Sequence, residues 1–314
     1  RLMTNSAASA SGSFTDKNVG TAKTVTLTET ISGADAGNYT ITKQGSTTAN
    51  ITPATLTLAG ASGITKTYDG NTSLPSGIAG YGSLTGILAS DVVTVAGTPV
   101  FASANVVRSD LADLTSAATT QAINRGTVLL AGADSGNYSL SWTNGSGTIN
   151  PITLTMSSPT TVNNKVYDGN TIAAINSAGT VTGYLGAQTL GVTPVAQFAD
   201  ANAGSSKAYT VSYQLADGSN GGKATNYSLP NVTVATGTST AAITTKVLSL
   251  TGLVVSDKVY DGTTTATIAS NGTLSGFVGT ETLTLNGTAA PSFADKNVGV
   301  NKTVNITGLG LTNG

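Results

Sequence analysis

The sequence predicts an all-β fold, arranged as a tandem array of small modules of about 95 residues each. Three observations lead to this prediction. Polar and apolar residues alternate along short stretches, clusters of Gly, Asn, Asp and Ser interrupt these stretches, and several short motifs recur with one common period. Alternation with a period of two is typical of strands that bury one face, and internal repetition indicates a modular chain.

The alternating stretches define the expected strands. Residues 24–28 read Thr-Val-Thr-Leu-Thr, residues 39–42 read Tyr-Thr-Ile-Thr, and residues 303–306 read Thr-Val-Asn-Ile. Turn residues separate such stretches at intervals typical of a β-sandwich, of an immunoglobulin-like or β-grasp-like kind. We also expect a short helix near residues 111–122. The Ile-Thr-Pro linker at residues 51–53 is short and stiffened by proline, so we expect an elongated rod.

The repeat rests on several motifs that keep the same order along the chain. Lys-x-Tyr-Asp-Gly occurs three times, with its tyrosines spaced by 99 and 93 residues. A Phe-x-x-x-Asn motif occurs four times, and an Asn-Tyr pair followed by an Ile-x-Pro-like string occurs three times. The predicted structural positions are Tyr68, Gly70, Tyr167, Gly169, Tyr260 and Gly262 in the first motif, Phe14, Phe101, Phe198 and Phe293 in the second, and Tyr39, Tyr138 and Tyr227 in the third.

These motifs place module boundaries near Pro53, Pro151 and Thr245. Residues 1–53 are then the C-terminal part of one module, and residues 246–314 the N-terminal part of another. Residues 54–151 and 152–245 are complete modules. The first thirteen residues are small and polar without the features of a signal peptide, so we expect the chain to be part of a longer protein.

Composition excludes several classes of function. The chain has no His and no Cys, so neither a Ser-His-Asp nor a Cys-His catalytic arrangement is available. Its 14 basic and 15 acidic residues give a net charge of −1, which does not indicate a nucleic-acid partner. No apolar run is long enough for a membrane span. We expect no enzyme, no catalytic residue and no cofactor.

The Tyr-Asp-Gly string has a structural interpretation, in which Tyr packs, Asp accepts hydrogen bonds within its own turn and Gly supplies a positive φ. Two sharper alternatives remain open. The recurring carboxylates could ligate Ca²⁺, although each module has few acids for a six- to eight-oxygen site. The recurring lysines could instead form isopeptide bonds with the asparagines of the Asn-Tyr pairs. The calcium candidates are Asp69, Asp168 and Asp261, the candidate lysines are Lys66, Lys165 and Lys258, and the asparagines are Asn38, Asn137 and Asn226.

The motifs resemble the YDG repeat domain of very large secreted bacterial proteins of the filamentous-haemagglutinin and two-partner-secretion type. The strings Lys-Val-Tyr-Asp-Gly at 258–262, Phe-Ala-Asp-Lys-Asn-Val-Gly at 293–299 and Gly-Asn-Tyr at 37–39 carry the resemblance. It implies an extracellular location at the bacterial surface and a role in cell adhesion or biofilm. The second Phe-x-x-x-Asn string departs from the pattern, because Ser103 and Ala104 stand where Asp and Lys are expected.

We expect a structural stalk or fibre segment of a secreted adhesin, whose immediate partners are neighbouring repeats of the same chain. One alternative is a self-assembling extracellular filament, joined head to tail by completion of the two half-modules with other copies. The other is direct binding of a surface receptor or glycan through variable loops, such as residues 109–122.

Overall fold

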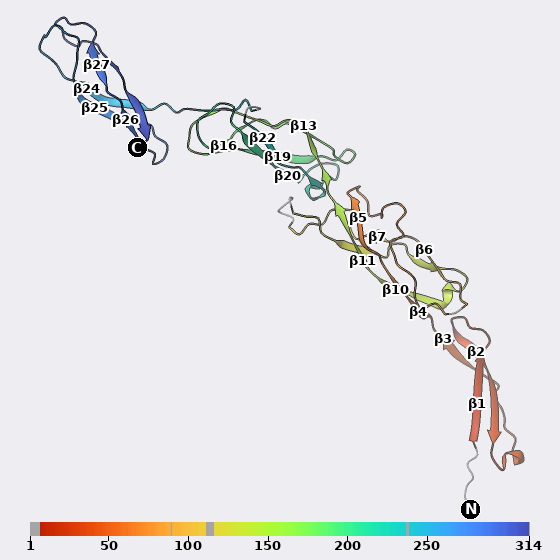
Figure 1. Ribbon diagram of the computed structural model, residues 1–314. Coiled ribbons are helices and arrows are strands. Elements are labelled where there is room, and N and C mark those ends of the chain that lie inside the picture. The colour runs from red at the N-terminus through yellow and green to blue at the C-terminus, as the bar shows by residue number, and fades with distance from the viewer. Residues whose placement is uncertain (1–6, 89, 111–115, 237–238, 314) are drawn as a thin grey trace, which may run out of the picture. The chain divides into compact units, whose positions relative to one another are not determined.

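The computed structural model describes residues 7–88, 90–110, 116–236 and 239–313, and these are predominantly strands and turns (Figure 1). The all-β prediction is confirmed. The helical segments among the described residues are three single turns of 3₁₀ helix, η1 (Ala36–Asn38), η2 (Ser135–Asn137) and η3 (Ala224–Asn226). The short helix expected near residues 111–122 is wrong over residues 116–122, because the strand β8 (Gln121–Asn124) begins there. Residues 111–115 lie outside the described residues.

The chain divides into two compact units, and each is described by itself. Unit 1 contains Arg1–Leu154, Gly183–Leu190 and Ala216–Ser228, and unit 2 contains Thr155–Thr182, Gly191–Leu215 and Leu229–Gly314. We call the four sequence segments copy 1 (residues 1–53), copy 2 (54–151), copy 3 (152–245) and copy 4 (246–314).

In unit 1, copy 1 is a three-stranded antiparallel sheet. In copy 2, strands from the beginning of the segment pair in parallel with strands from its end. In copy 2, β4 pairs in parallel with β10, and β5 pairs in parallel with β11. The start of copy 3 repeats this with β12 and β21. The remaining strands of copy 2 form the ladder β5-β11-β8-β7 and the pair β6-β9.

The strands of unit 1 are β1 (Ala7–Phe14), β2 (Gly20–Ser32), β3 (Ser46–Ile51), β4 (Ala54–Ala59), β5 (Ser62–Thr67), β6 (Thr94–Ala96), β7 (Val100–Phe101), β8, β9 (Leu129–Ala131), β10 (Tyr138–Thr143), β11 (Gly145–Asn150), β12 (Ile152–Thr153) and β21 (Tyr227–Ser228). One or two residues separate β3 from β4 and β11 from β12, and a proline lies in each gap. Proline fixes φ and has no N–H to pair, which suits the point where one copy ends and the next begins.

Unit 2 contains the rest of copy 3 and copy 4. Copy 3 has the four-stranded ladder β16-β19-β20-β22 and short pairs, among them the parallel pair β15-β23, whereas copy 4 consists of three antiparallel pairs. The strands of copy 3 here are β13 (Thr155–Ser158), β14 (Thr161–Val162), β15 (Lys165–Val166), β16 (Ile172–Ala173), β17 (Ile175–Ser177), β18 (Thr180–Thr182), β19 (Leu190–Phe198), β20 (Tyr209–Asp217), β22 (Val232–Val234) and β23 (Ile243–Thr244). Those of copy 4 are β24 (Ser249–Val255), β25 (Ile268–Ser275), β26 (Leu283–Asn286), β27 (Ala290–Phe293), β28 (Val304–Thr307) and β29 (Gly310–Asn313).

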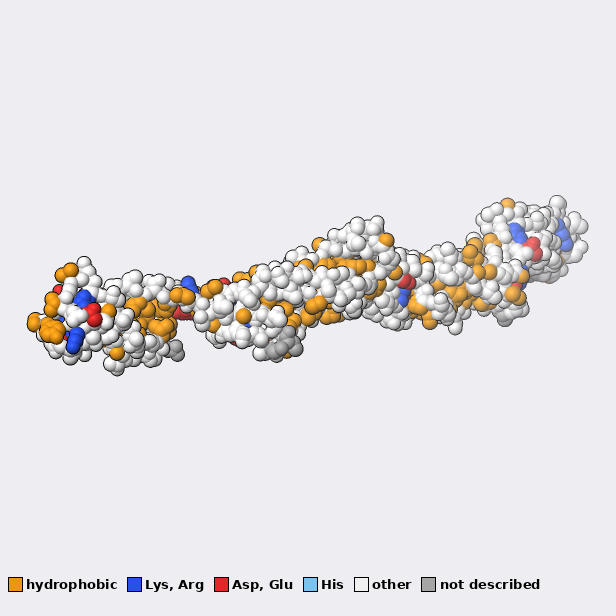
Figure 2. Space-filling model, turned by 90° about the horizontal axis from the view of Figure 1, so that it is seen from above, with side chains coloured by type: hydrophobic (Ala, Val, Ile, Leu, Met, Phe, Trp, Pro, Cys, Tyr) orange, Lys and Arg blue, Asp and Glu red, His pale blue; other side chains and the backbone are white. Residues whose placement is uncertain are grey.

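Each complete copy buries a thin apolar core. In copy 2, Leu56, Val93 and Tyr138 form one cluster. In copy 3, a cluster around Phe198 and Val211 includes residues of β14, β16, β19, β20 and β23. Most of the surface visible in Figure 2 is polar and uncharged, with few charged side chains. Within the described part of the chain, no helix has the length and apolar character needed to cross a membrane.

Candidate functional site

The lysine of each Lys-x-Tyr-Asp-Gly motif lies within the turn that follows it. Lys66 Nζ donates to Asp69 Oδ1 at 2.7 Å, to the Asn71 carbonyl oxygen at 2.8 Å and to the Ser73 carbonyl oxygen at 2.9 Å. Only 7% of the Lys66 side chain is exposed, so its ammonium group depends on these acceptors. Corresponding acceptors surround the lysines of the next two copies, Lys165 and Lys258.

The same lysine also joins two motifs within a copy. Lys66 Nζ lies 5.4 Å from the ring centroid of Phe101, the first residue of the Phe-x-x-x-Asn motif. The corresponding distances are 6.0 Å in copy 3 and 5.7 Å in copy 4. These distances are typical of cation–π interactions, which hold the two turns next to each other within a copy. The hydrogen bond from Lys258, followed by those from Thr263, lowers the pKa of Asp261 from 3.8 to about 2.

The Phe-x-x-x-Asn turn has its own acceptor. In copy 1, Asp16 Oδ1 accepts from the Asn18 N–H at 2.8 Å and from Lys23. In copy 2, whose string lacks the Asp and the Lys, Ser103 Oγ accepts from the Asn105 N–H at 3.0 Å. Gln121 takes the place of the lysine: its Oε1 accepts from the Ser103 N–H, and its Nε2 donates to the Asn105 carbonyl oxygen. A hydroxyl and a carboxamide thus replace a carboxylate and an ammonium, so the turn keeps its shape.

An asparagine pair joins each of the first two copies to the next. The Val19 N–H donates to Asn137 Oδ1 at 2.9 Å, and Asn137 Nδ2 donates to Asn18 Oδ1 at 3.2 Å. The second junction repeats both bonds: Val106 N–H to Asn226 Oδ1 at 2.8 Å, and Asn226 Nδ2 to the side-chain oxygen of Asn105 at 2.9 Å. The turn of one copy is therefore bound by the Asn-Tyr pair of the following copy.

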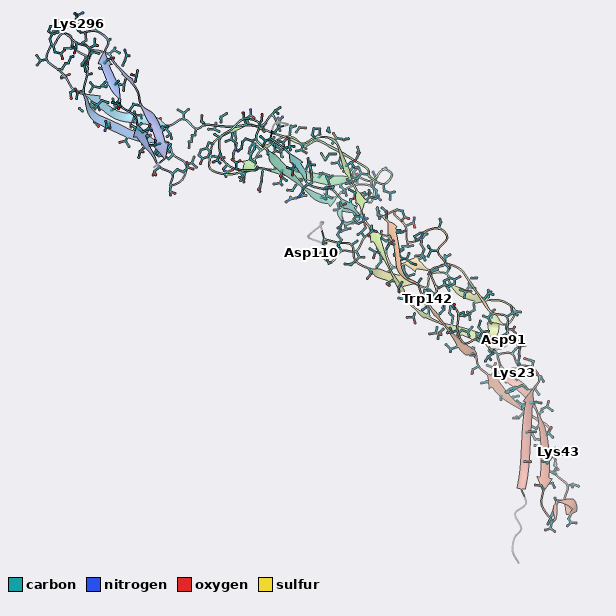
Figure 3. The ribbon with its side chains drawn as sticks, viewed as in Figure 1. Lys23, Lys43, Asp91, Asp110, Trp142 and Lys296 are labelled. Carbon is teal, nitrogen blue, oxygen red and sulfur yellow. The ribbon has the colours of Figure 1, made fainter. Side chains whose placement is uncertain are left out.

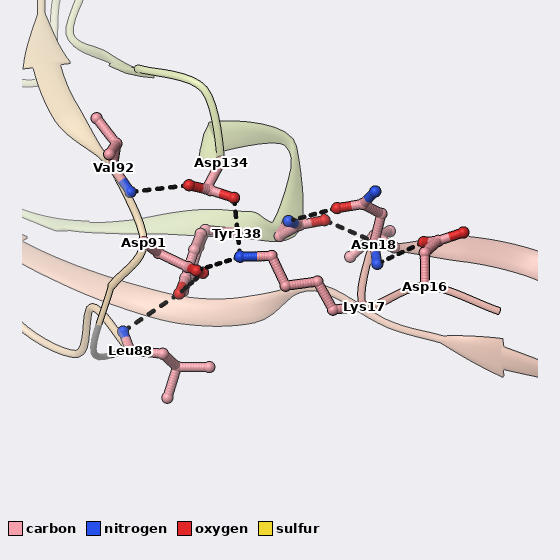
Figure 4. Close-up of polar contacts among 10 residues, drawn as sticks. Asp16, Lys17, Asn18, Leu88, Asp91, Val92, Asp134 and Tyr138 are labelled. Carbon is pink, nitrogen blue, oxygen red and sulfur yellow. Dashed lines mark hydrogen bonds and ion pairs between the residues drawn. The ribbon is translucent and has the colours of Figure 1, made fainter. Parts of the chain in front are cut away.

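An ion pair accompanies the first asparagine pair (Figure 4). Lys17 Nζ lies 2.5 Å from Asp91 Oδ1 and 3.1 Å from Asp134 Oδ1. The bond from Lys17, followed by that from Tyr138, lowers the pKa of Asp91. For Asp134 the backbone N–H of Val92 is the first cause of a lowered pKa and Lys17 the second. Both carboxylates are therefore held ionised where the two copies meet.

The tyrosine of Tyr-Asp-Gly bonds a turn of the next copy. Gln188 Nε2 donates to Tyr68 OH at 3.1 Å, and Tyr227 OH donates to Gln188 Oε1 at 2.5 Å. The rings of Tyr68 and Tyr227 pack edge to face with centroids 5.8 Å apart. At the third junction, within unit 2, Tyr167 OH donates to Glu281 Oε1.

The receiving turn has one geometry in all three places. The N–H of Asp91, Gln188 and Glu281 each donates to the carbonyl three residues earlier at 3.1 Å. We call the turns that end at Asp91, Gln188 and Glu281 the receiving turns.

The glycine of Tyr-Asp-Gly has two roles. Gly70, Gly169 and Gly262 have φ values of 79°, 78° and 81°, which few other residues adopt. A Cβ on Gly70 would lie 3.1 Å from Leu185, and one on Gly169 would lie 2.9 Å from Val278, both in receiving turns. A Cβ on Gly262 would meet nothing within 4 Å. The glycine therefore forms the turn and lets the next copy approach.

The variable loop of copy 2 also reaches the next copy. Arg108, only 6% exposed, donates from Nε to the Thr225 carbonyl at 3.1 Å and from Nη2 to the Tyr227 carbonyl at 3.0 Å. Its Nη1 donates to the Ser116 carbonyl at 2.6 Å. Arg108, which directly precedes this loop, therefore links Ser116 of the loop to the junction between copies 2 and 3.

The structure buries some of the predicted aromatic residues, exposes others and leaves Tyr167 and Phe293 half-buried. Tyr68, Tyr138, Tyr227, Phe101 and Phe198 are buried, whereas Tyr260 is 58%, Tyr39 71% and Phe14 40% exposed. The buried group lies in copies 2 and 3. The exposed group lies in copies 1 and 4.

The calcium and isopeptide hypotheses stay predictions, and the structure shows the present partners of their residues. Asp69, Asp168 and Asp261 each pair with the lysine of their own motif. No group of three or more acidic side chains suited to a metal occurs among the described residues. The lysines contact their own turns, while Asn137 and Asn226 contact the preceding copy, so the structure does not bring the proposed pairs together.

Sequence reasoning missed the receiving turns. Asp91, Gln188 and Glu281 differ in type, but each follows the tyrosine of its motif by 21 to 23 residues, a spacing that could have identified them. Figure 3 labels Asp91 and Lys23 in unit 1, and Lys296 in a loop of copy 4 in unit 2.

The family model of the YDG domain matches four segments of the chain, residues 3–49, 52–145, 150–236 and 244–314. Together these cover most of its length. No curated protein matches the chain.

Proposed function

The chain belongs to the YDG domain family, and we propose that it is a structural stalk or fibre segment of a secreted bacterial surface adhesin. In this role it extends a binding region away from the cell and has no enzymatic activity of its own. The observation that carries the proposal is the repeated junction, in which Asn137 and Asn226 each bind the turn of the preceding copy through the same two hydrogen bonds.

A repeated junction supports a mechanical role for a physical reason. Each copy contacts its neighbours through fixed positions, so adding copies adds length without a new interface. The motif residues Tyr68 and Gly70 are occupied by this packing, as is Arg108 just before the variable loop, whereas Lys66 bonds its own turn. The recurring residues therefore serve the joints between copies.

The test separates reach from binding. In the parent adhesin on living cells, residues 54–245 are deleted, or replaced by unrelated β-domains of equal total length. Deletion should abolish adhesion to targets beneath a thick surface layer and spare adhesion to bare targets, and the replacement should restore it. Saturable binding of the purified chain itself to host cells or glycans would overturn the stalk role in favour of direct binding.

Exposed edges in copies 1 and 4 favour a second candidate, the head-to-tail filament. In copy 2, Tyr138 begins a strand that pairs in parallel with β4, whereas its counterpart Tyr39 is 71% exposed and begins no strand. An open hollow of about 480 Å³ lies beside it, lined by residues 31–36 and 39–42. Copy 4 of a second chain could supply the missing strand. Light scattering decides: a mass that grows with concentration supports the filament, and a constant monomer mass rejects it.

A further inference from the structure

The recurring lysine of the Lys-x-Tyr-Asp-Gly motif ends among four oxygens of its own turn. In copy 2 this lysine is Lys66. Its Nζ lies 2.7 Å from Asp69 Oδ1, 2.8 Å from the Asn71 carbonyl oxygen and 2.9 Å from the Ser73 carbonyl oxygen. The fourth oxygen, Asn71 Oδ1, lies 3.3 Å away, and the Phe101 ring centroid lies 5.4 Å away. We call the four oxygens the cation cage of the copy.

Copies 3 and 4 have the same cation cage, with oxygens from the residues three, five and seven positions after the lysine. The four distances from Nζ are 2.7 to 3.0 Å around Lys165 and 2.8 to 3.1 Å around Lys258. The middle position contributes both its carbonyl and a side-chain oxygen, although the residue changes from Asn170 to Thr263. The set of oxygens is therefore kept where the residue type is not.

The cage has more oxygens than a lysine can bond. A lysine ammonium group has three N–H donors, so four oxygens cannot each receive a separate hydrogen bond from it. A spherical cation has no such limit, and a free ammonium ion has a fourth N–H. Carboxylate, carbonyl and carboxamide oxygens are also the groups with which proteins hold hard cations. The arrangement is therefore that of a cation site.

Charge and size favour a monovalent cation. Asp69 is the one charged group among the four oxygens of its cage, so it balances a single positive charge. A divalent ion would leave a positive charge in excess where the Lys66 side chain is only 7% exposed, and buried charge without a partner is costly. The distances in this cage, from 2.7 Å upward, also exceed the roughly 2.3–2.6 Å of calcium–oxygen contacts.

We propose that the Tyr-Asp-Gly turn is a binding site for a monovalent cation, and that its occupant in this chain is the ammonium group of the chain's own lysine. Tethering replaces a concentration in solution by a fixed effective concentration, so the turn keeps its cation at any salt composition around the protein. When the lysine is removed and its space is left open, the same oxygens should take ammonium or potassium from solution. This inference goes beyond the stalk role and does not depend on it.

Two variants of one residue test the proposal. Lys66→Ala removes the ammonium group and leaves its space open, whereas Lys66→Met removes the ammonium group and fills that space. Urea unfolding is followed by the fluorescence of Trp142, which lies in the same copy. The salts are ammonium, potassium and tetramethylammonium chloride at one ionic strength, and tetramethylammonium is the control because it is bulky and has no N–H.

We expect ammonium and potassium to stabilise Lys66→Ala in a saturable way. Its unfolding equilibrium constant should fall about tenfold when the ion is present at about ten times its dissociation constant. The original chain and Lys66→Met should not distinguish the three salts. The proposal is overturned if Lys66→Ala does not distinguish them either, or if Lys66→Met responds as strongly.

The charge class and the place of the ion are tested in the same background. Calcium chloride at equal ionic strength should stabilise Lys66→Ala less than ammonium does, and a larger effect of calcium would contradict the monovalent class. Adding Asp69→Asn should remove the response to ammonium, because this carboxylate supplies the negative charge of the cage. An undiminished response would place the ion elsewhere and reject the site.

Copy 4 provides a second site if Lys66→Ala does not fold in any of the salts. Lys258 is more exposed than Lys66, at 25% of its side chain, so Lys258→Ala should disturb folding less. Amide chemical shifts are followed by NMR as ammonium replaces tetramethylammonium. Saturable shifts confined to residues 261–265 and Phe293 support the site. Shifts that are absent, or that spread evenly over the chain, reject it.

Discussion

Asn226 is fully buried against the turn of the preceding copy, where its Oδ1 accepts the Val106 N–H at 2.8 Å. Its Nδ2 donates to Asn105 at 2.9 Å, so this one carboxamide bonds two groups of that turn. Arg108 and the Tyr68–Tyr227 ring pair surround it. The asparagine of the Asn-Tyr pair is therefore a residue of the joint, and the ring of Tyr227 packs across the same joint on Tyr68.

Replacing this carboxamide should weaken the second junction. Asn226→Ala leaves the Val106 N–H without its partner, and an unsatisfied buried donor costs about 1–3 kcal/mol. Hydrogen exchange of the Val106 amide measures the loss. Asn202→Ala is the matched control, because this exposed turn asparagine in copy 3 has no recorded partner in another copy among the described residues, and it should change stability by less than about 0.5 kcal/mol. Equal effects of the two substitutions would contradict the role of Asn226.

The lysine within the Tyr-Asp-Gly turn should be structural. Lys66→Met keeps the apolar part of the side chain and removes the ammonium from three acceptors, which should cost about 1–3 kcal/mol. Trp142 is the one tryptophan and lies in the same copy, so its fluorescence during urea unfolding reports this copy. The exposed Lys43, for which the described part of the chain records no ion pair, provides the control Lys43→Met, with a change below about 0.5 kcal/mol. A comparable loss in both variants would remove the special role of Lys66.

The glycines of two copies separate backbone strain from contact with the next copy. Gly169 and Gly262 have φ values of 78° and 81°, so alanine should cost about 1–2 kcal/mol at either site. At Gly169 the new Cβ would also lie 2.9 Å from Val278, so Gly169→Ala should be the more harmful change. Hydrogen exchange near Glu281 should quicken only in Gly169→Ala. The reverse order of the two variants would contradict the packing of Val278 on this glycine.

Stability should fall in acid through the paired carboxylates. Hydrogen bonds from lysines lower the pKa of Asp16, Asp200 and Asp295, and that of Asp261 falls from 3.8 to about 2. A lowered folded-state pKa means that the unfolded chain binds more protons, so stability is fully present above about pH 4 and is lost as the pH falls toward 2. Urea unfolding between pH 6 and pH 2 measures this.

The matched variant is Asp261→Asn, which should flatten the profile of copy 4 between pH 4 and pH 2. A stability that stays constant down to pH 2 in the original chain would contradict the lowered pKa values.

The all-β class, the order of the motifs and the recurring residues could be predicted from the amino-acid sequence. Of the expected strands, the one at residues 39–42 is wrong, because these residues form no strand in copy 1. Alternation of Thr with Val, Leu and Ile fixes which face of a strand is buried, and Tyr-Asp-Gly fixes a turn with a positive φ, because both are local properties of the chain. Such local signals also placed Tyr68, Phe101 and Tyr227 among the structural positions.

The contacts of those residues could not be predicted and are known from the three-dimensional structure. The partner of Lys66 is its own turn, and the partner of Asn226 is a turn about 120 residues earlier. The receiving turns end at residues of different type, Asp91, Gln188 and Glu281. Each follows a Thr-Gly or Ser-Gly string, but this string does not show which surface the turn meets, because a junction requires a matching pair of surfaces and sequence periodicity describes one surface at a time. The helix expected over residues 116–122 is wrong because long-range pairing with β11 makes Gln121–Asn124 a strand, and such pairing overrides local propensity.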